Sequence, residues 1–525
     1  MKHSIRTLAM LGLAAGLAIA STARADEADN AGGKDNQDQI EELRTTLGTM
    51  SAQINSMQGI LNMIQVHGFA EFDAFNDTTG SFQEVVGNGA VKLYEPVAGA
   101  FTNDNGQTQE SVRNSRFDFL AQNKIGDWKA KGYLELDLLG YDPAPLYGAP
   151  AAANTTVSAG PPAKGTTAAS NTAASASEAG FYTNATVRVR HAYTDAQNGG
   201  WDIMAGQYWT LLGWNMDYTL ATVSVAPVMG VIYQRTPQLR LGYTFMNNSD
   251  FKIQTAVDAE RPTEREADQP NYSQGVRFIY AGWNGNFAGA TGPSKSVPLS
   301  LGISGTEREF KYYQVATPTN SEYDYAVWGQ ALAVDALVPV IPFDGKDSMS
   351  LVLTGEWSAG SGYGDEFPSW SGGASALSAA TGNPDLDSGL GMLDARNGLY
   401  GKTPVFTLVQ DQTWNAQVQF HLPPSIGTFF TFGYGQIHSP NVDDLLNYGN
   451  GGAVGKIYDT DSAVFANIMQ DFGTTVRVAL EFDSFSTHYA GNLAAAPTVV
   501  GGVTVGTDGV WARDNRLQLS TYYRF

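Results

Sequence analysis

Residues 128–139, WKAKGYLELDLL, alternate between two kinds of side chain. Even positions carry Trp, Ala, Gly and Leu, whereas odd positions carry Lys129, Lys131, Tyr133, Glu135 and Asp137. A period of two residues is that of a β-strand, in which successive side chains point to opposite faces. The stretch therefore predicts a strand with one apolar face and one charged face.

Two architectures use such a strand. A soluble sandwich buries the apolar face and exposes the polar one to water. A membrane barrel does the reverse, because its apolar face contacts lipid and its charged face lines a water-filled lumen. The choice depends on whether the pattern recurs and on where the chain is sent.

The alternation recurs along the whole chain. It starts with VHGFAEFDAFND at Val66 and ends with LQLSTYYRF, residues 517–525. Other segments with this pattern lie around Phe117, Trp128, Val187, Leu239, Phe251, Val297, Met349, Trp414 and Val476, and weaker ones near Trp201, Val276, Tyr325, Phe430 and Val464. We predict about sixteen strands, an even number that can close into a barrel without edges.

The first residues indicate export. Lys2 and Arg6 precede an apolar run, residues 8–19, and a small-x-small cleavage site follows at residues 23–25. The competing interpretation is a membrane anchor, but the run is shorter than the roughly 20 residues that a spanning helix needs. We therefore expect residues 1–25 to be a signal peptide that is removed.

Composition narrows the class of protein. The chain has 31 basic and 52 acidic residues, a net charge of −21, so nucleic acid is not an expected partner. It has no cysteine, which excludes disulfides, thiolate metal sites and cysteine nucleophiles. An exported, acidic chain rich in glycine and aromatic residues predicts an all-β, transmembrane antiparallel β-barrel in a Gram-negative outer membrane, in contact with lipid and lipopolysaccharide.

A heptad pattern precedes the barrel. Apolar residues fall at Ile40, Leu43, Leu47, Met50, Ile54, Met57, Leu61 and Ile64. This spacing predicts a short coiled-coil helix, and its a and d residues are not the arrangement that favours dimers. We expect residues 26–65 to be a polar spacer and a trimerisation stalk, and residues 66–525 to be the barrel. The alternative is one amphipathic helix that packs on the main domain.

The predicted connections alternate in length. Short turns at residues 123–127, 196–200 and 423–427 are expected at the periplasmic end. The longest connection, residues 142–180, is rich in Ala and Thr and predicts a surface loop. The segment 211–231 is fairly apolar and lacks alternation, so we expect a loop that folds into the pore; a loop facing lipid or another subunit is the alternative.

Acidic residues gather in two other long connections, namely Asp385, Asp387 and Asp394 in one, and Asp443 and Asp444 in the other. Carboxylates of this kind can hold a divalent cation, yet the ligand spacing of an EF-hand is missing. We favour solvated acidic loops over a metal site, and we expect no cofactor. The sequence also shows no histidine metal pair, G-x-S-x-G motif or P-loop, so an enzyme is not predicted.

Several short motifs resemble the DcaP-like family of trimeric outer-membrane porins. They are HGFAEFDAFND directly after the stalk, SRFDFLAQ, LELDL, VRVRHAY followed by AGQYWT, YQRTPQLRLGY, FANIMQDF, VRVALEF and the terminal LQLSTYYRF. The resemblance implies a homotrimer of barrels, each with an in-folded loop, that takes up small organic anions such as dicarboxylates. The Ala/Thr-rich insertion and the acidic loops depart from that pattern. A terminal strand that ends in Phe525 also looks like the signal read by the barrel-assembly machinery.

Ten charged residues are candidates for the pore lining, namely Arg113, Arg116, Arg188, Arg190, Arg235, Arg240, Lys129, Lys131, Glu71 and Asp73. Arg188 and Arg190 are two positions apart, so on a barrel strand both point inward. A guanidinium keeps its charge and donates two hydrogen bonds to one carboxylate, which suits an anionic solute. Alternatively, the arginines pair with Glu71, Asp73, Asp118, Glu135 and Asp137 and leave no net preference.

Other functions remain open at this point. A general or cation-preferring porin, a structural or adhesive barrel and a barrel enzyme all fit an outer-membrane β-barrel. Conductance across a bilayer, partner binding by the loops and lipid hydrolysis would distinguish them.

Overall fold

The computed structural model describes residues 41–51, 53, 64–82, 90–93, 106–140, 187–224, 229–262, 267–314, 323–345, 347–367, 370, 391–394, 405–443, 457–491, 498–500, 503–506 and 508–525. The expected signal peptide, residues 1–25, and the expected Ala/Thr-rich loop, residues 142–180, lie outside these residues. Asp385, Asp387 and Asp444 also lie outside them. Within the described part, no helix is both long enough and apolar enough to cross a membrane.

The chain divides into two units, Met1–Gln65 and Val66–Phe525. In the first unit residues 41–51 are helical, and Leu43 and Leu47 of the heptad pattern are 53% and 50% exposed. Ile64, the last apolar position of that pattern, is instead the first residue of a strand. Ile64 and Val66 are β-branched, and such residues favour strands.

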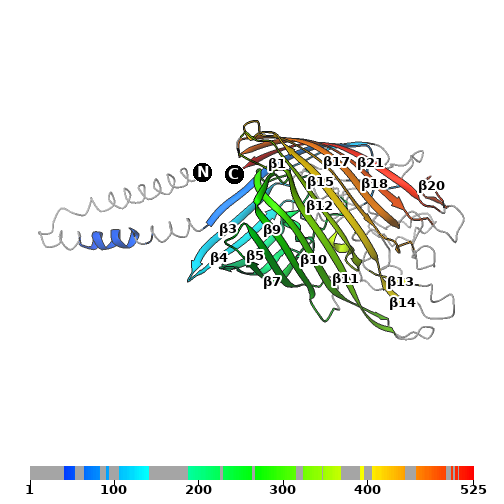
Figure 1. Cartoon of the computed structure of the whole chain (residues 1–525), viewed down its shortest axis with the longest axis horizontal. Helices are drawn as coiled ribbons and strands as arrows, with labels where there is room; N and C mark the ends of the chain where they lie inside the picture. Colours follow the sequence, from blue (N-terminus) through cyan, green and yellow to red (C-terminus); the bar gives the residue numbers. More distant parts are fainter. Residues whose placement is uncertain are drawn as a thin grey trace, which may run out of the picture. The chain divides into compact units, whose positions relative to one another are not determined.

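The second unit is a barrel of tilted strands (Figure 1). Its strands are β1 (Ile64–Asp77), β2 (Gln107–Ser111), β3 (Arg116–Ile125), β4 (Trp128–Asp137), β5 (Arg188–Asn198), β6 (Trp201–Trp209), β7 (Arg235–Phe245), β8 (Phe251–Glu260), β9 (Asn271–Phe287), β10 (Lys295–Gln314), β11 (Tyr323–Ile341), β12 (Ser350–Ser361), β15 (Gln410–His421), β16 (Thr428–His438), β17 (Tyr458–Phe472), β18 (Val476–Tyr489) and β21 (Val510–Arg524). These described strands form one 17-stranded sheet in which β2 and β3 both pair with β1. Counted as one interrupted strand, β2 and β3 leave sixteen.

The sheet closes on itself. Each strand is antiparallel to its neighbour, and β21 pairs with β1, so that Phe72 lies opposite Thr521. Every one of the sixteen predicted segments contains one of these strands. The prediction of a closed antiparallel barrel is confirmed.

The sequence pattern missed five short strands. β2 interrupts the first long connection, and two hairpins lie in later ones: β13 (Gly391–Asp394) with β14 (Val405–Leu408), and β19 (Thr498–Val500) with β20 (Val503–Val505). The strands of the two hairpins have three or four residues, too few to show a period of two.

The two faces of each strand settle the choice between sandwich and membrane barrel. On β18, Leu480 and Phe482 are 45% and 48% exposed, whereas Glu481 and Asp483 beside them are 0% exposed. The apolar residues therefore face outward and the charged residues inward. This arrangement fits lipid outside and polar contacts inside.

The connections alternate between the two ends of the barrel. The predicted short turns are present, with Gly126, Gly199 and Gly427 in left-handed conformations at φ of +61°, +60° and +76°. At Gly427 a Cβ would lie 2.5 Å from the carbonyl oxygen of Asp471, so glycine is required there. We call this end the short-turn end; the long connections lie at the other.

The apolar core lies inside the barrel, where inward-folded connections pack on the wall. Its largest cluster joins segments from several connections, including Phe82, Val91, Leu212, Ile232 and Trp370, with inward side chains of the later strands. The lumen is therefore partly filled by the chain itself.

Candidate functional site

The described residues of the connection between β6 and β7, 210–224 and 229–234, fold into the lumen; we call them the inner loop. This loop contains the short helix η2 (Leu212–Asp217). Gly213 N–H donates to Ser304 Oγ on β10 at 2.8 Å, and Ala221 N–H donates to Gln417 Oε1 on β15 at 2.8 Å. Because these partners are inward residues of the opposite wall, the prediction of a loop inside the pore is confirmed.

The tip of the inner loop is fixed on β18. Glu481 accepts hydrogen bonds from Val223 N–H at 2.9 Å, Ser224 N–H at 2.9 Å and Thr222 Oγ1 at 2.6 Å. Ser224 Oγ also donates to Asp483 at 2.8 Å. A carboxylate that accepts several backbone N–H groups makes stronger hydrogen bonds than a neutral acceptor.

The loop returns to β7 through Gly230, which has a φ of +79°. A Cβ there would lie 2.2 Å from the carbonyl oxygen of Gln436, so the backbone lies directly against β16. Asn415 Nδ2 donates to Gly230 O at 3.1 Å. Glycine is needed at this position because only it combines a positive φ with so close an approach.

A second connection holds both ends of the inner loop. The short helix η3 (Gly364–Glu366) follows β12. Thr210 Oγ1 donates to the Glu366 carboxylate at 2.9 Å, and Tyr233 N–H donates to the Glu366 carbonyl at 2.7 Å. Arg308 of β10 forms ion pairs with Asp365 and Glu366. The entry and exit of the loop are thus fixed by one residue.

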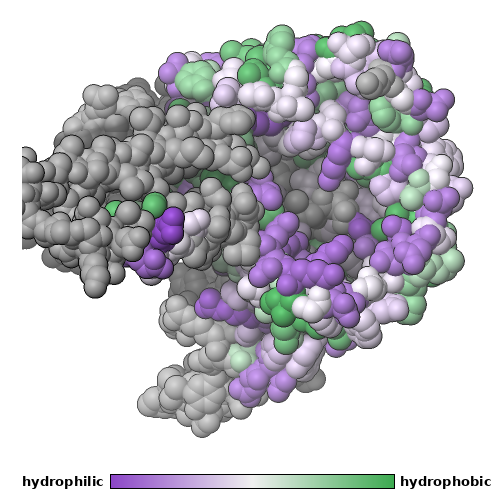
Figure 2. Space-filling view, turned by 90° about the vertical axis from the view of Figure 1, so that its left-hand side faces the viewer, coloured by the Kyte–Doolittle hydropathy of each residue, from purple (hydrophilic) through white to green (hydrophobic). Residues whose placement is uncertain are grey.

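The loop leaves one side of the lumen more open than the other. Side chains of Lys131 on β4 and Arg188 on β5 are 33% and 39% exposed, whereas Gln419 of β15 and Arg477 of β18 are 0% exposed. Figure 2 shows hydrophilic residues gathered around a hollow in the barrel end that faces the viewer. The more accessible side of the lumen therefore includes β4 and β5.

Arginines line this open side. Arg116 of β3 lies opposite Asp137 of β4, which in turn lies opposite Arg188 of β5. Arg188 makes two hydrogen bonds to Asp137, at 3.1 and 2.7 Å. Arg190 contacts Glu135 at 2.6 Å and Asp137 at 3.0 Å. The predicted inward direction of Arg188 and Arg190 agrees with these contacts.

Arg235 has no carboxylate partner among the described residues. Its guanidinium lies over the ring of Trp209 at 4.9 Å and near the ring of Tyr233 at 5.7 Å. Its Nη1 is buried without a hydrogen-bond partner in the described part of the chain. We call Arg116, Arg188, Arg190 and Arg235 the arginine cluster. The first three share the carboxylates Glu135 and Asp137.

Tyr233, at the end of the inner loop, lies inside the arginine cluster. Its hydroxyl accepts a hydrogen bond from Arg190 Nη2 at 3.2 Å. Burial by itself raises the pKa of the Tyr233 phenol. The nearby positive charges of Arg190, Arg116 and Arg235 outweigh this effect and lower the pKa below its ordinary value, to about 7. A phenol that ionises near neutral pH changes the charge of the site.

The remaining candidates lie outside the cluster. Arg240 pairs with Asp258 at 3.1 Å, and Arg113 donates to the carbonyls of Leu138 and Gly140. Lys131 pairs with Asp195 at 3.0 Å, and Lys129 is exposed towards the short-turn end.

Glu71 and Asp73 lie in the filled part of the lumen. Glu71 accepts from Asn114 Nδ2 at 2.6 Å, and Asp73 accepts from Gln518 Nε2 at 3.0 Å. Neither forms an ion pair with an arginine among the described residues. The alternative, in which carboxylates pair with the arginines, therefore applies to the arginines that contact Glu135 and Asp137. It does not apply to Arg235.

Sequence reasoning missed the aromatic part of the site. A register shift between Glu135 and Leu136 places both Arg190 and His191 inward, against strict alternation. The ring of His191 lies 5.2 Å from that of Tyr208 and 5.4 Å from that of Trp209. In the sequence, the only sign of this aromatic part was the adjacent pair Tyr208 and Trp209 in AGQYWT.

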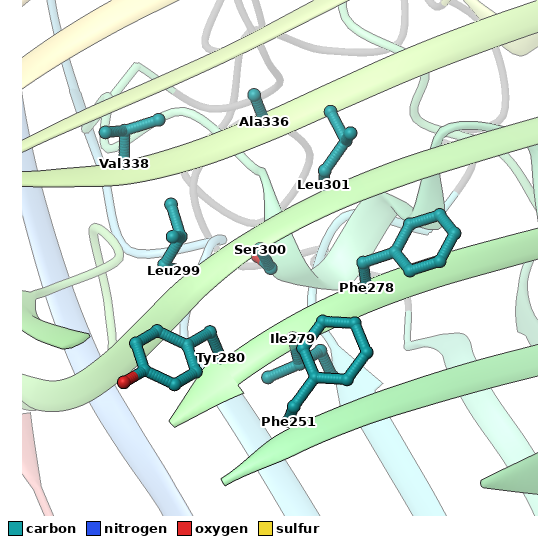
Figure 3. Close-up of a pocket in the computed structure, with 9 residues that line it drawn as sticks. All are labelled: Phe251, Phe278, Ile279, Tyr280, Leu299, Ser300, Leu301, Ala336 and Val338. Atoms are coloured by element: carbon teal, nitrogen blue, oxygen red, sulfur yellow. The ribbon is translucent and has the colours of Figure 1, made fainter. Parts of the chain in front are cut away.

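Other kinds of site find little support in the described residues. No group of three His, Asp or Glu side chains there is arranged to hold a metal ion. A hollow of about 210 Å³ lies on β8 to β11, lined mostly by apolar side chains such as Phe251, Phe278, Tyr280 and Leu301 (Figure 3). Phe251, Tyr280 and Leu301 are exposed on the outer face, so this hollow is separate from the arginine cluster.

The fold matches that of a solved outer-membrane channel. The crystal structure of the outer membrane channel DcaP of Acinetobacter baumannii has a TM-score of 0.51 and 14% identity, over 88% of this chain and 97% of that chain. The resemblance to DcaP-like porins is therefore confirmed at the level of the fold. No family model and no curated protein matches the sequence.

Two other solved structures are more distant. The anion-selective porin from Comamonas acidovorans has a TM-score of 0.45 and 9% identity, over 88% of this chain and 99% of that chain. Pseudomonas putida OprB has a TM-score of 0.45 and 10% identity, over 90% of this chain and 96% of that chain.

Proposed function

We propose that this protein is an outer-membrane porin through which small hydrophilic solutes diffuse, with a preference for organic anions such as dicarboxylates. The porin fold supports a channel. The observation that carries the anion preference is Arg235, a guanidinium without a carboxylate partner in the described residues, close to the charges of Arg190, Arg188 and Arg116.

The geometry suggests how an anion is favoured. Arg188 is partly exposed, and Arg116, Arg190 and Arg235 lie in the same cluster. A solute carboxylate at Arg235 would take the place that no protein carboxylate fills, and a second carboxylate could reach Arg188. Passage requires that such binding stay weak enough for release.

Replacing Arg235 by glutamine is expected to reduce the anion preference. The substitution removes one positive charge without leaving a protein carboxylate unpaired, unlike Arg190→Ala. The reversal potential of single channels in a salt gradient measures the effect. Arg513→Gln, on an exposed residue of β21, makes the same change in charge and should leave selectivity unchanged. A wild-type channel that prefers cations would refute the proposal.

The pH dependence of selectivity is a second prediction. As pH rises through about 7, Tyr233 loses its proton and the phenolate offsets part of the arginine charge. Anion preference should therefore be greatest below pH 7 and decline above it. Reversal potentials measured across this range test the idea, and Tyr233→Phe should abolish the decline. A decline that persists in Tyr233→Phe would show that another group causes it.

A cation-preferring or general porin is the second candidate. The observation that favours it is the acidic inner wall, where Asp77, Glu481, Asp483 and Asp514 are 0% exposed, together with the net charge of −21. The same reversal-potential measurement separates the two. A structural or adhesive barrel would show no regular conductance.

The assembly we propose follows from the same chain. Residues 1–25 direct export, and the helix at 41–51 belongs to a stalk that joins three barrels. Exposed Leu43 and Leu47 support the stalk, because an isolated chain leaves such a heptad face uncovered. The apolar outer face would contact lipid and lipopolysaccharide in the outer membrane.

A further inference from the structure

The turn between β9 and β10, residues 288–294, lies at the short-turn end but does not point away from the barrel. Ala288 is 0% exposed. Its N–H donates to Gln419 Oε1 at 2.7 Å, and its carbonyl accepts from Gln419 Nε2 at 3.0 Å. Since Gln419 is an inward residue of β15, the turn enters the lumen.

Two arginines hold the turn on the far wall. Arg477 Nη1 of β18 donates to the carbonyls of Gly289 at 2.6 Å and Ala290 at 2.7 Å. Arg524 Nε of β21 donates to the Thr291 carbonyl at 2.9 Å. Both guanidiniums also contact Asp471, which orients them. The turn therefore reaches from its own strands to β15, β18 and β21.

The turn packs directly beneath the tip of the inner loop. Ala288 and Val223 belong to one buried apolar cluster, which also contains Phe69, Phe429, Met469, Ala479 and Tyr522. Val223 is the residue whose N–H is bound by Glu481. Tip and turn thus form two layers that close the same part of the lumen.

This closed part contains carboxylates. Along β18 from the short-turn end, Arg477 and Ala479 contact the turn or its cluster, and Glu481 and Asp483 follow. Along β1, Phe69 of the same cluster precedes Glu71 and Asp73. The turn therefore lies between the short-turn mouth and these four buried carboxylates.

We infer that the 288–294 turn is a selectivity-determining element, which separates the acidic half of the lumen from the short-turn mouth and confines ions to the arginine-lined half. This inference rests on the proposed passage along the arginine cluster. The physical basis is that an inward carboxylate in contact with the water path attracts cations. Covered by the turn and the loop tip, the same carboxylates are withdrawn from that path.

The test shortens the turn without disturbing its strands. Phe287 and Lys295 are paired, so replacing residues 288–294 by Asn-Gly makes a two-residue hairpin, the turn that such a connection favours. We expect larger single-channel conductance and a reversal potential shifted towards cations. As a matched control, residues 246–250 between β7 and β8 are all exposed and receive the same Asn-Gly replacement. The control should keep wild-type values.

A milder variant guards against misfolding. Arg477→Gln removes the two hydrogen bonds to Gly289 and Ala290 and leaves Asp471 paired with Arg524. It should shift the reversal potential in the same direction by a smaller amount.

The outcomes separate the two ideas. If the wild type is anion-selective and both turn variants keep its conductance and selectivity, the inference is overturned. The proposed function then still stands. Cation-selective wild type overturns the proposed function, and with it the confining role of the turn.

Discussion

Replacing Glu481 by alanine is expected to release the tip of the inner loop from the barrel wall and to increase the single-channel conductance. The carboxylate accepts from Thr222, Val223 and Ser224 of the loop and from Asn467 Nδ2 of β17 at 2.7 Å. Alanine offers no acceptor, so Thr222 Oγ1 and Val223 N–H lose their acceptor, whereas Ser224 N–H keeps Thr222 Oγ1 and Asn467 Nδ2 keeps the Ala221 carbonyl.

The magnitude follows from the cost of leaving donors unpaired. Each buried donor without a partner costs about 1–3 kcal/mol, so the two loop donors that lose their acceptor disfavour the docked loop by at least about 2 kcal/mol. Because 1.4 kcal/mol is a factor of ten, the docked population falls by roughly a factor of 30 relative to the released one. A loop that is nearly always docked becomes one that opens often.

Two measurements check this expectation. Single-channel recording should show a larger and noisier conductance in Glu481→Ala, and limited proteolysis should cut within residues 210–234. Glu481→Gln retains an acceptor of the same length, so we expect an intermediate effect. Wild-type conductance together with wild-type protease resistance in Glu481→Ala would show that other contacts fix the tip.

The strands could be predicted from the sequence because their signal is local. Alternation over a few residues predicts a strand, and each of the sixteen segments contains one, including the weak ones near Tyr325 and Val464. The inner loop could be recognised for the converse reason, since an apolar segment without alternation does not fit the wall of a barrel.

The contacts inside the lumen could not be predicted in this way. Glu481 binds a loop residue 258 positions away, and Arg477 binds a turn residue 188 positions away. No spacing in the chain records such pairs. The turn 288–294 carries only small and polar residues, so its sequence gives no sign that it enters the barrel.

The arginines show the limit most clearly. The sequence placed Arg188 and Arg190 on one face and left open whether carboxylates neutralise them. The structure gives both outcomes, because Asp137 and Glu135 pair with these two and Arg235 contacts aromatic rings instead. That distinction depends on Trp209 and Tyr233, which the inner loop brings together across its two ends.

Deleting Phe525 is expected to reduce assembly in the cell strongly while the finished barrel loses little stability. Phe525 N–H donates to Gly68 O at 3.0 Å, and Gly68 N–H donates to Phe525 O at 3.2 Å, at the seam between β21 and β1. Two such hydrogen bonds contribute roughly 1–3 kcal/mol in total. The ring is 41% exposed and lies 6.1 Å from that of Phe117. Its loss therefore costs only part of the free energy that a fully buried side chain would contribute.

A loss of this size leaves a sixteen-strand barrel folded, so a large defect in assembly would have to come from recognition and not from the seam. The measurement compares unassisted refolding in detergent with assembly by the purified insertion machinery in liposomes. The truncated chain should refold nearly as wild type does, yet assemble far more slowly with the machinery. Phe117→Ala removes the ring partner of Phe525 but keeps the terminus, so it should behave as wild type in both assays. Equal assembly rates for the truncated and full chains would leave Phe525 as an ordinary residue of the seam, and an equal defect in both assays would assign its role to the stability of that seam.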